Sequence, residues 1–209
     1  VPDGEGHDRI LILEDSERDG RADRSTVFAD GLSIPTGIVF ANGGIIVSNA
    51  PRFLFLQDTT GDDRADVRRT IMTGWSTVDT HSGPSNLQYG FDNWIWGAVG
   101  DAGFNGTIGG KPMQFEDAIY RMKPDGSELE IVTRFSNNTW SLGFSEAFDV
   151  FANSANNEHS VFVAIPNRFY ESATGLRGRG RARLDGHYER RTIAPTRQVD
   201  YFGGFSASG

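Results

Sequence analysis

The sequence predicts an all-β protein of the β-propeller class, with about four blades of a ring that we expect to have six or seven. Short segments rich in β-branched and aromatic residues alternate with turns, and the 209 residues include 26 glycines. No stretch keeps an apolar period of about 3.6 residues, so very little helix is expected. Related segments also recur along the chain. We therefore expect one partial propeller domain over residues 1–209, with an insertion loop at about 170–195.

Each expected strand is a short apolar segment bounded by turn-forming residues. In chain order the expected strands are Arg9–Leu13, Thr26–Ala29, Gly37–Phe40, Gly44–Ser48, Phe53–Gln57, Arg68–Met72, Asn86–Tyr89, Trp94–Ala98, Ala118–Met122, Leu129–Arg134, Ser141–Phe144, Val150–Ala152 and Val161–Ile165. Their regular spacing is typical of all-β folds.

An internal repeat groups these strands into units. The Asp-rich segment Asp15–Asp23 recurs 43 residues later as Asp58–Asp66, and a degenerate third copy lies at Ile119–Glu128. Each copy follows one apolar strand and precedes another, and a new strand pair comes after it. Four-stranded units of roughly 40–50 residues are typical of propeller blades. A closed four-bladed ring and an irregular β-sandwich are the alternatives.

Composition excludes several classes of function. The formal net charge is −8, which argues against general nucleic-acid binding and against docking on anionic lipid. The chain has no cysteine, so it cannot form a disulfide, a zinc–thiolate, an iron–sulfur or a covalent haem site. No apolar run reaches about 18 residues, so no membrane span is expected.

The two Asp-rich turns are candidate calcium sites, because calcium binds six to eight oxygen ligands at flexible distances. The candidate ligands are Asp15, Glu17, Asp19 and Asp23 in the first turn, and Asp58, Thr60, Asp62 and Asp66 in the second. Neither turn has the glutamate of an EF-hand loop. The alternative is a polar hairpin turn in which aspartates accept hydrogen bonds from backbone amides.

His81 and Asp101 are the candidate catalytic residues. His81 lies in a loop before one expected strand, and Asp101 follows the next strand. In a propeller such loops surround the central axis, so the two side chains are expected at one mouth. A carboxylate beside an imidazole holds it in one tautomer, which suits a general base. The alternative is a surface histidine in a turn.

Two asparagine pairs occupy corresponding loops of successive units. They are Asn137-Asn138 and Asn156-Asn157. Asparagine amides both donate and accept hydrogen bonds, so they suit a sugar, a quinone carbonyl or a metal ion. The alternative is turn formation, because asparagine tolerates left-handed backbone. The tryptophans, Trp75 among them, are expected to pack the blades or to form a sugar-stacking platform.

Several segments together resemble one family of large exported bacterial proteins. These segments are Asp58–Asp66, Thr80–Leu87, Asn93–Gly100, Lys123–Glu130, Ser136–Trp140, Ile165–Tyr170 and Arg197–Gly204. The family is the membrane-bound dehydrogenase domain of the PVC-type haem-binding CxxCH proteins. The resemblance implies an N-terminal propeller, a cytochrome c domain elsewhere in the polypeptide, and a periplasmic or extracellular location. The CxxCH motif is absent here, so we expect no haem in this chain.

The chain is more distantly similar to soluble quinoprotein sugar dehydrogenases, which are six-bladed propellers that use pyrroloquinoline quinone and calcium. The resemblance places their base at His81, their helper carboxylate at Asp101 and their Arg-Asn quinone contact at Asn137-Asn138. The arginine is not matched, and neither is their calcium-binding Gly-Pro loop, which falls near Asn156-Asn157.

This resemblance implies a dehydrogenase that oxidises a sugar or an alcohol and passes electrons to a cytochrome c domain. Its expected partners are the remainder of the propeller and that domain or another chain. One alternative is a non-catalytic propeller that binds glycan or protein. Another is a calcium-dependent hydrolase of the lactonase kind, with Asp101, Asn138 and Asn156 around the metal.

Overall fold

The computed structural model describes residues 5–155, 161–163, 166, 168–169 and 182–183. Its strands are β1 (Asp8–Glu14), β2 (Arg24–Leu32), β3 (Gly37–Ala41), β4 (Gly44–Asn49), β5 (Arg52–Gln57), β6 (Val67–Thr73), β7 (Ser85–Tyr89), β8 (Ile95–Val99), β9 (Phe104–Ile108), β10 (Lys111–Phe115), β11 (Ala118–Met122), β12 (Leu129–Arg134), β13 (Thr139–Phe144), β14 (Val150–Ser154), β15 (Val161–Phe162) and β16 (Ala182–Arg183). No described helix is long and apolar enough to cross a membrane.

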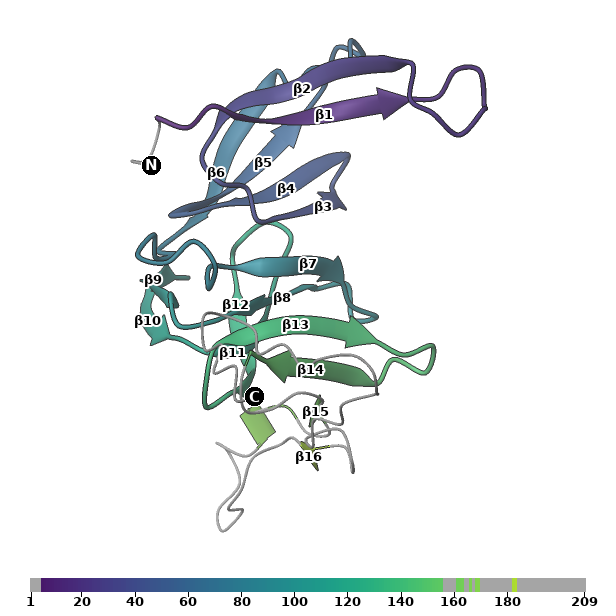
Figure 1. The fold of residues 1–209 in the computed structure, drawn as a ribbon. Helices are drawn as coiled ribbons and strands as arrows, with labels where there is room; N and C mark the ends of the chain where they lie inside the picture. Colours follow the sequence, from purple (N-terminus) through teal and green to yellow (C-terminus); the bar gives the residue numbers. More distant parts are fainter. Residues whose placement is uncertain (1–4, 156–160, 164–165, 167, 170–181, 184–209) are drawn as a thin grey trace, which may run out of the picture.

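The strands form three four-stranded antiparallel sheets that follow one another along the chain. Their orders are β3-β4-β5-β6, β12-β11-β8-β7 and β13-β14-β15-β16. The hairpin β1-β2 packs before the first of these sheets, and the hairpin β9-β10 is inserted in the middle one. The sheets form an open stack (Figure 1). The first strands are neighbours, with β3 beside β7 and β7 beside β13, as inner strands are in a propeller. The prediction of a partial propeller is therefore confirmed.

The middle strands of each sheet are apolar on both faces because a sheet packs against each side. On β5, Phe53 and Phe55 face the core shared with the next sheet, while Leu54 and Leu56 face the β1-β2 hairpin. Successive side chains of a strand point to opposite faces, so both sets are buried. Stacking of sheets with these faces forms three apolar cores along the chain.

Trp75 lies at the centre of the core between the first and middle sheets. It follows β6, is 1% exposed, and stacks on Phe53 with ring centroids 4.8 Å apart. Its other ring neighbours are Phe104, Phe115 and Tyr120, at 4.9, 6.1 and 4.8 Å. Trp75 therefore joins the first sheet, the β9-β10 hairpin and the middle sheet, and its predicted packing role is confirmed.

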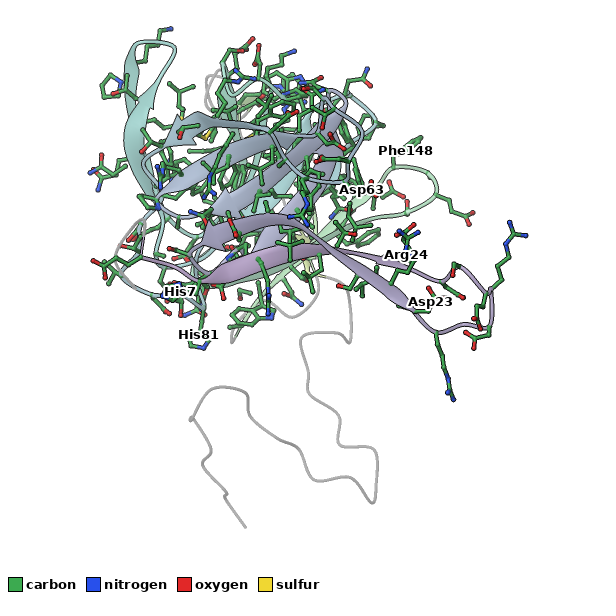
Figure 2. The ribbon with its side chains drawn as sticks, turned by 90° about the horizontal axis from the view of Figure 1, so that it is seen from above. His7, Asp23, Arg24, Asp63, His81 and Phe148 are labelled. Carbon is green, nitrogen blue, oxygen red and sulfur yellow. The ribbon has the colours of Figure 1, made fainter. Side chains whose placement is uncertain are left out.

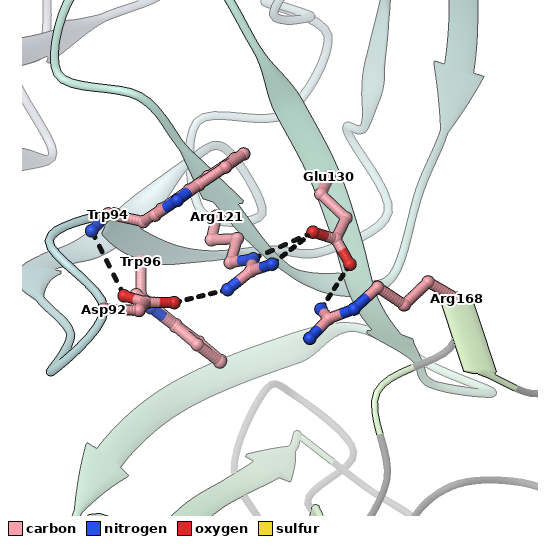
Figure 3. A network of polar contacts seen from close by, with 6 residues as sticks. All are labelled: Asp92, Trp94, Trp96, Arg121, Glu130 and Arg168. Carbon is pink, nitrogen blue, oxygen red and sulfur yellow. Dashed lines mark hydrogen bonds and ion pairs between the residues drawn. The ribbon is translucent and has the colours of Figure 1, made fainter.

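Arg121 is the centre of a polar network on the middle sheet (Figure 3). Its guanidinium forms ion pairs with Asp92 and with Glu130, whose carboxylate is 2.6 Å from Arg121 Nη2. It also lies over the ring of Trp94, 4.5 Å from the centroid. Arg168 binds the other oxygen of Glu130 at 2.6 Å. The Arg121 side chain is only 14% exposed, so its charge is compensated within the protein.

The internal repeat is present in three dimensions. In the first Asp-rich turn, the backbone N–H of Asp23 donates to the carbonyl of Glu14 at 2.9 Å. In the second turn, the N–H of Asp66 donates to the carbonyl of Gln57 at 3.0 Å. These partners are 43 residues apart in the sequence, so β1 and β2 correspond to β5 and β6, the third and fourth strands of a blade.

One hairpin lies outside the expected strands. β9 and β10 are not among the strands that the sequence predicts, and Gly106 and Pro112 interrupt their apolar pattern. The turn Gly109-Gly110 has positive φ angles of 56° and 79°, as a two-residue hairpin turn requires. Most of the expected insertion loop at 170–195 lies outside the described residues, so that boundary stays a prediction.

Candidate functional site

The loops at one end of the sheets carry the predicted catalytic residues. His81 precedes β7 and Asp101 follows β8. Because β7 and β8 are antiparallel, the start of one and the end of the other lie at the same end of the sheet. We call this end the loop face, and it comprises residues 74–84, 100–103, 116–117 and 135–138.

Close contacts between Ser82, Gly100 and Asn138 join these loops. The N–H of Gly100 donates to the carbonyl of Ser82 at 2.9 Å, and the N–H of Ala102 donates to Ser82 Oγ at 2.9 Å. The Asn138 amide fills the place of a side chain at position 100, so a Cβ there would collide with Asn138 Oδ1. Glycine at position 100 therefore lets the loop before β13 pack against the loop before β7 and the loop after β8.

His81 is an exposed side chain with a carboxylate beside it. Asp79 accepts a hydrogen bond from the backbone N–H of His81 at 2.9 Å, and its Oδ1 lies 3.4 Å from His81 Nδ1. The hydrogen bond from the His81 N–H is the main reason that the pKa of Asp79 is lowered. Asp79 is therefore charged at neutral pH and suited to orient the imidazole.

Asp101 lies beside a second carboxyl group, that of Asp117. Burial, a hydrogen bond with Asp101 and repulsion by its charge raise the pKa of Asp117 to about 7. The N–H of Thr139 donates to Asp117 and opposes this rise. Two carboxyl groups that share a site can share one proton near neutral pH, which suits acid–base chemistry.

Buried acceptors without a hydrogen-bond partner lie on the loops that carry this carboxyl pair. Within the part of the chain that the structure describes, Asp117 Oδ1, Asn138 Oδ1 and Thr139 Oγ1 are buried and have no hydrogen-bond partner. A cavity of about 530 Å³ lies at the base of the β9-β10 hairpin, where Ala102, Gly103 and Glu116 are among its lining residues, but none of the three acceptors lines it. Unpaired buried acceptors favour a ligand that brings donors or positive charge.

Only one of the two predicted asparagine pairs lies within the described residues. Asn138 is half-buried against Gly100, and Asn137 precedes it on the loop face. Asn156 and Asn157 lie outside the described residues. The amide contact predicted at 137–138 thus sits at the same mouth as His81 and Asp101, and its role as a cofactor contact stays a prediction.

The Asp-rich turns lie on the side of the molecule opposite His81. Figure 2 shows His81 and His7 on one side and Asp23 and Asp63 on the other. The predicted calcium sites therefore do not belong to the loop face.

Backbone amides are bound by the carboxylates of these turns. Asp15 accepts from the N–H of Gly20 at 2.8 Å, and Asp58 accepts from the N–H of Gly61 at 2.7 Å. Asp23 accepts from Ser16 Oγ at 2.7 Å. No group of three or more His, Asp or Glu among the described residues is arranged to hold a metal. The contacts match the alternative of amide-capping turns, and calcium in these turns stays a prediction.

A family model described as "Domain of unknown function (DUF7133)" matches residues 2–207. The chain belongs to this DUF7133 family. No curated protein sequence matches it.

Two solved structures are similar to this DUF7133 chain. One is the PQQ-bound form of an aldose sugar dehydrogenase from Streptomyces coelicolor, with 17% identity, a TM-score of 0.48, and coverage of 71% of this chain and 52% of that one. The other is a glucose dehydrogenase, with 16% identity, a TM-score of 0.45, and coverage of 72% and 51%. The chain therefore spans about half the length of these structures.

Asp79 and Asp117 are site residues that the sequence did not single out. The spacing Asp-x-His at 79–81 is a signal for Asp79, because an aspartate often accepts from the N–H two residues on. No sequence signal marks Asp117 in the DUF7133 chain. It approaches Asp101 because both flank the inserted β9-β10 hairpin, which was itself not expected.

Replacement of Asp117 by asparagine should flatten the pH dependence of stability. The folded pKa of Asp117 is raised to about 7 from 3.8, so the folded state binds the proton more tightly than the unfolded state. Stability of the wild type should thus fall as pH rises from about 4 to 7. Relative to Asp117→Asn, the wild type should lose on the order of 1–2 kcal/mol of unfolding free energy by pH 8. The loss is smaller than the pKa difference alone would give, because solvent screens this partly exposed site.

Denaturant unfolding at pH 4.5 and pH 8 measures this difference. Asp63→Asn is a matched control, because Asp63 and Asp117 both have left-handed backbone, with φ of 64° and 48°, which asparagine tolerates. Parallel pH profiles for the wild type and Asp117→Asn would contradict the raised pKa of Asp117.

Proposed function

We propose that this chain is the propeller domain of a quinoprotein-like dehydrogenase that oxidises a hydroxyl group of a sugar or an alcohol. The proposal extends to transfer of the electrons to a cytochrome c domain of the same exported PVC-type polypeptide. The observation that carries it is the packing of Ser82, Gly100 and Asn138, which gathers three loops with predicted site residues around one mouth.

His81 is the proposed base for the hydroxyl proton. It is exposed on the loop face, and a neutral imidazole accepts a proton near neutral pH. Asp79 orients the ring and stabilises the imidazolium that forms, because its own carboxylate is held in the charged form. In this proposal Asp101 acts with Asp117 and not as the direct partner of His81. The raised pKa of Asp117, about 7, lets this carboxyl group hold or release a proton near neutral pH.

Two unpaired oxygens on the loop face support the proposal of a calcium-bound quinone. The unpaired oxygens of Asp117 and Asn138 are ligands that calcium prefers. The amide N–H groups of Asn137 and Asn138 would donate to quinone oxygens. When bound, a quinone held there would supply the hydride acceptor for oxidation of the hydroxyl-bearing carbon. Asn137 lacks the charge of the arginine that the resemblance would place there, so affinity should depend strongly on the cation.

Replacement of His81 by asparagine in the full-length protein tests the assignment of the base. Oxidation of sugars or alcohols with an artificial electron acceptor should fall by about 10²–10⁴-fold, since asparagine cannot take the proton. His7→Asn is the control, because His7 is also exposed and precedes β1 on another sheet. Equal loss in both variants, or none in His81→Asn, contradicts the mechanism.

The same protein distinguishes the dehydrogenase from the two alternatives. Lactone hydrolysis that continues after removal of quinone and stops with a chelator would favour a hydrolase. Glycan binding without turnover, measured by calorimetry, would favour a non-catalytic propeller.

A further inference from the structure

An apolar groove on the first sheet is independent of the loop face and of the proposed function. The groove has a volume of about 580 Å³ and lies between the β1-β2 hairpin and strands β3 and β4. Ile10, Leu11 and Phe28 line one wall, and Ile38 and Phe40 line the other. Phe40 is 81% exposed and Ile38 is 47% exposed. Large apolar side chains that share one groove favour a partner over solvent.

β1 has one strand partner in the part of the chain that the structure describes. It pairs with β2 on one edge. By the internal repeat β1 corresponds to β5, which pairs with β4 on one edge and with β6 on the other. The second edge of β1 therefore presents backbone donors and acceptors where β5 has a strand.

In the next sheet, a side chain at a position equivalent to those that face the groove is covered by a neighbouring strand. Leu87 on β7 points toward the preceding sheet and is 8% exposed, because β3 packs over it. Ile38 and Phe40 hold the corresponding positions on β3 and point toward the groove. A strand beside β3 would bury them as β3 buries Leu87.

We propose that the groove holds a β-hairpin from the same polypeptide, outside the described residues, whose second strand pairs with the free edge of β1. The hairpin takes the places that β3 and β4 have in the next sheet and completes a four-stranded blade over β1 and β2. Its second strand is apolar on both faces, as β4 is, and its first strand carries apolar side chains toward Ile38 and Phe40.

Matched substitutions in the full-length polypeptide test whether the groove is covered. Phe40 and Val78 are 81% and 93% exposed, so in the described residues alone both should tolerate aspartate. We expect Phe40→Asp to lower the melting temperature by about 4 °C or more, because the hairpin would bury the new charge. Val78→Asp should leave it unchanged. Equal melting temperatures for the two variants would overturn the proposal.

A photo-crosslinking amino acid at position 40 identifies the occupant. The expected product is a crosslink within one polypeptide, at a yield independent of protein concentration, to a segment that mass spectrometry places outside the described residues. A crosslink between two copies that increases with concentration would assign the groove to self-association and overturn the proposal. Reaction with solvent alone would show an open groove and do the same. Neither experiment depends on His81 or on a quinone, so its failure leaves the proposed function standing.

Discussion

Trp75→Ala should destabilise the protein by about 3–5 kcal/mol, the largest stability effect that we expect from a single substitution. Trp75 is 1% exposed and contacts rings from the first sheet, the inserted hairpin and the middle sheet. Truncation leaves a cavity between these three elements, and the rigid strands around it can collapse only in part. Urea unfolding followed by far-ultraviolet circular dichroism measures the loss.

Trp75→Phe is the control that removes the indole N–H group but keeps an aromatic ring at this position. Trp75 Nε1 is buried without a hydrogen-bond partner among the described residues, so phenylalanine loses no polar contact. Most of the ring stacking remains, and we expect less than half of the loss seen with alanine. A loss below about 1 kcal/mol for Trp75→Ala would contradict the packing of blades around this residue.

Arg121→Met should cost about 3 kcal/mol, because removal of one partner leaves buried charge uncompensated. The side chains of Asp92 and Glu130 are 17% and 21% exposed and face the Arg121 guanidinium. Hydrogen bonds from Trp96, Trp94 and Arg121 outweigh burial and lower the pKa of Asp92, so this carboxylate stays charged at neutral pH. Methionine preserves the length of the side chain, and the loss therefore reports the ion pairs.

Two further variants separate geometry from charge in this network. Arg121→Lys keeps the charge but cannot span both carboxylates, so an intermediate loss is expected. The double variant Arg121→Met with Glu130→Gln should recover part of the stability that Arg121→Met loses. Thermal unfolding of the set measures both. If Arg121→Met is as stable as the wild type, the network contributes no net stability.

Much of the fold could be predicted because turn residues and apolar alternation act locally. The repeat of Asp15–Asp23 at Asp58–Asp66 marks equivalent turns, and both turns connect the third and fourth strands of a blade. The β9-β10 hairpin could not be recognised from apolar strands, because its segments are short and interrupted by Gly and Pro. Its Gly109-Gly110 turn was the available signal.

Only the part of the candidate site that follows from the order and direction of the strands could be predicted. Loops before β7 and after β8 must share one end of a sheet, so His81 and Asp101 were expected on the same face. The partners of these side chains depend on tertiary contacts. Asp117 approaches Asp101 across the inserted hairpin, and Asn138 reaches the site because position 100 lacks a side chain. No local pattern encodes those two contacts.

Titration of pyrroloquinoline quinone into the full-length protein, with and without calcium, tests the central claim most directly. We expect a saturable change in quinone absorbance that requires calcium. Asp101→Asn should bind more weakly, because the loop face loses a carboxylate that attracts the cation. Saturable binding with both dependences would support a calcium-bound quinone on the loop face. The absence of saturable binding in the wild type, or calcium-independent binding that Asp101→Asn leaves unchanged, would contradict it.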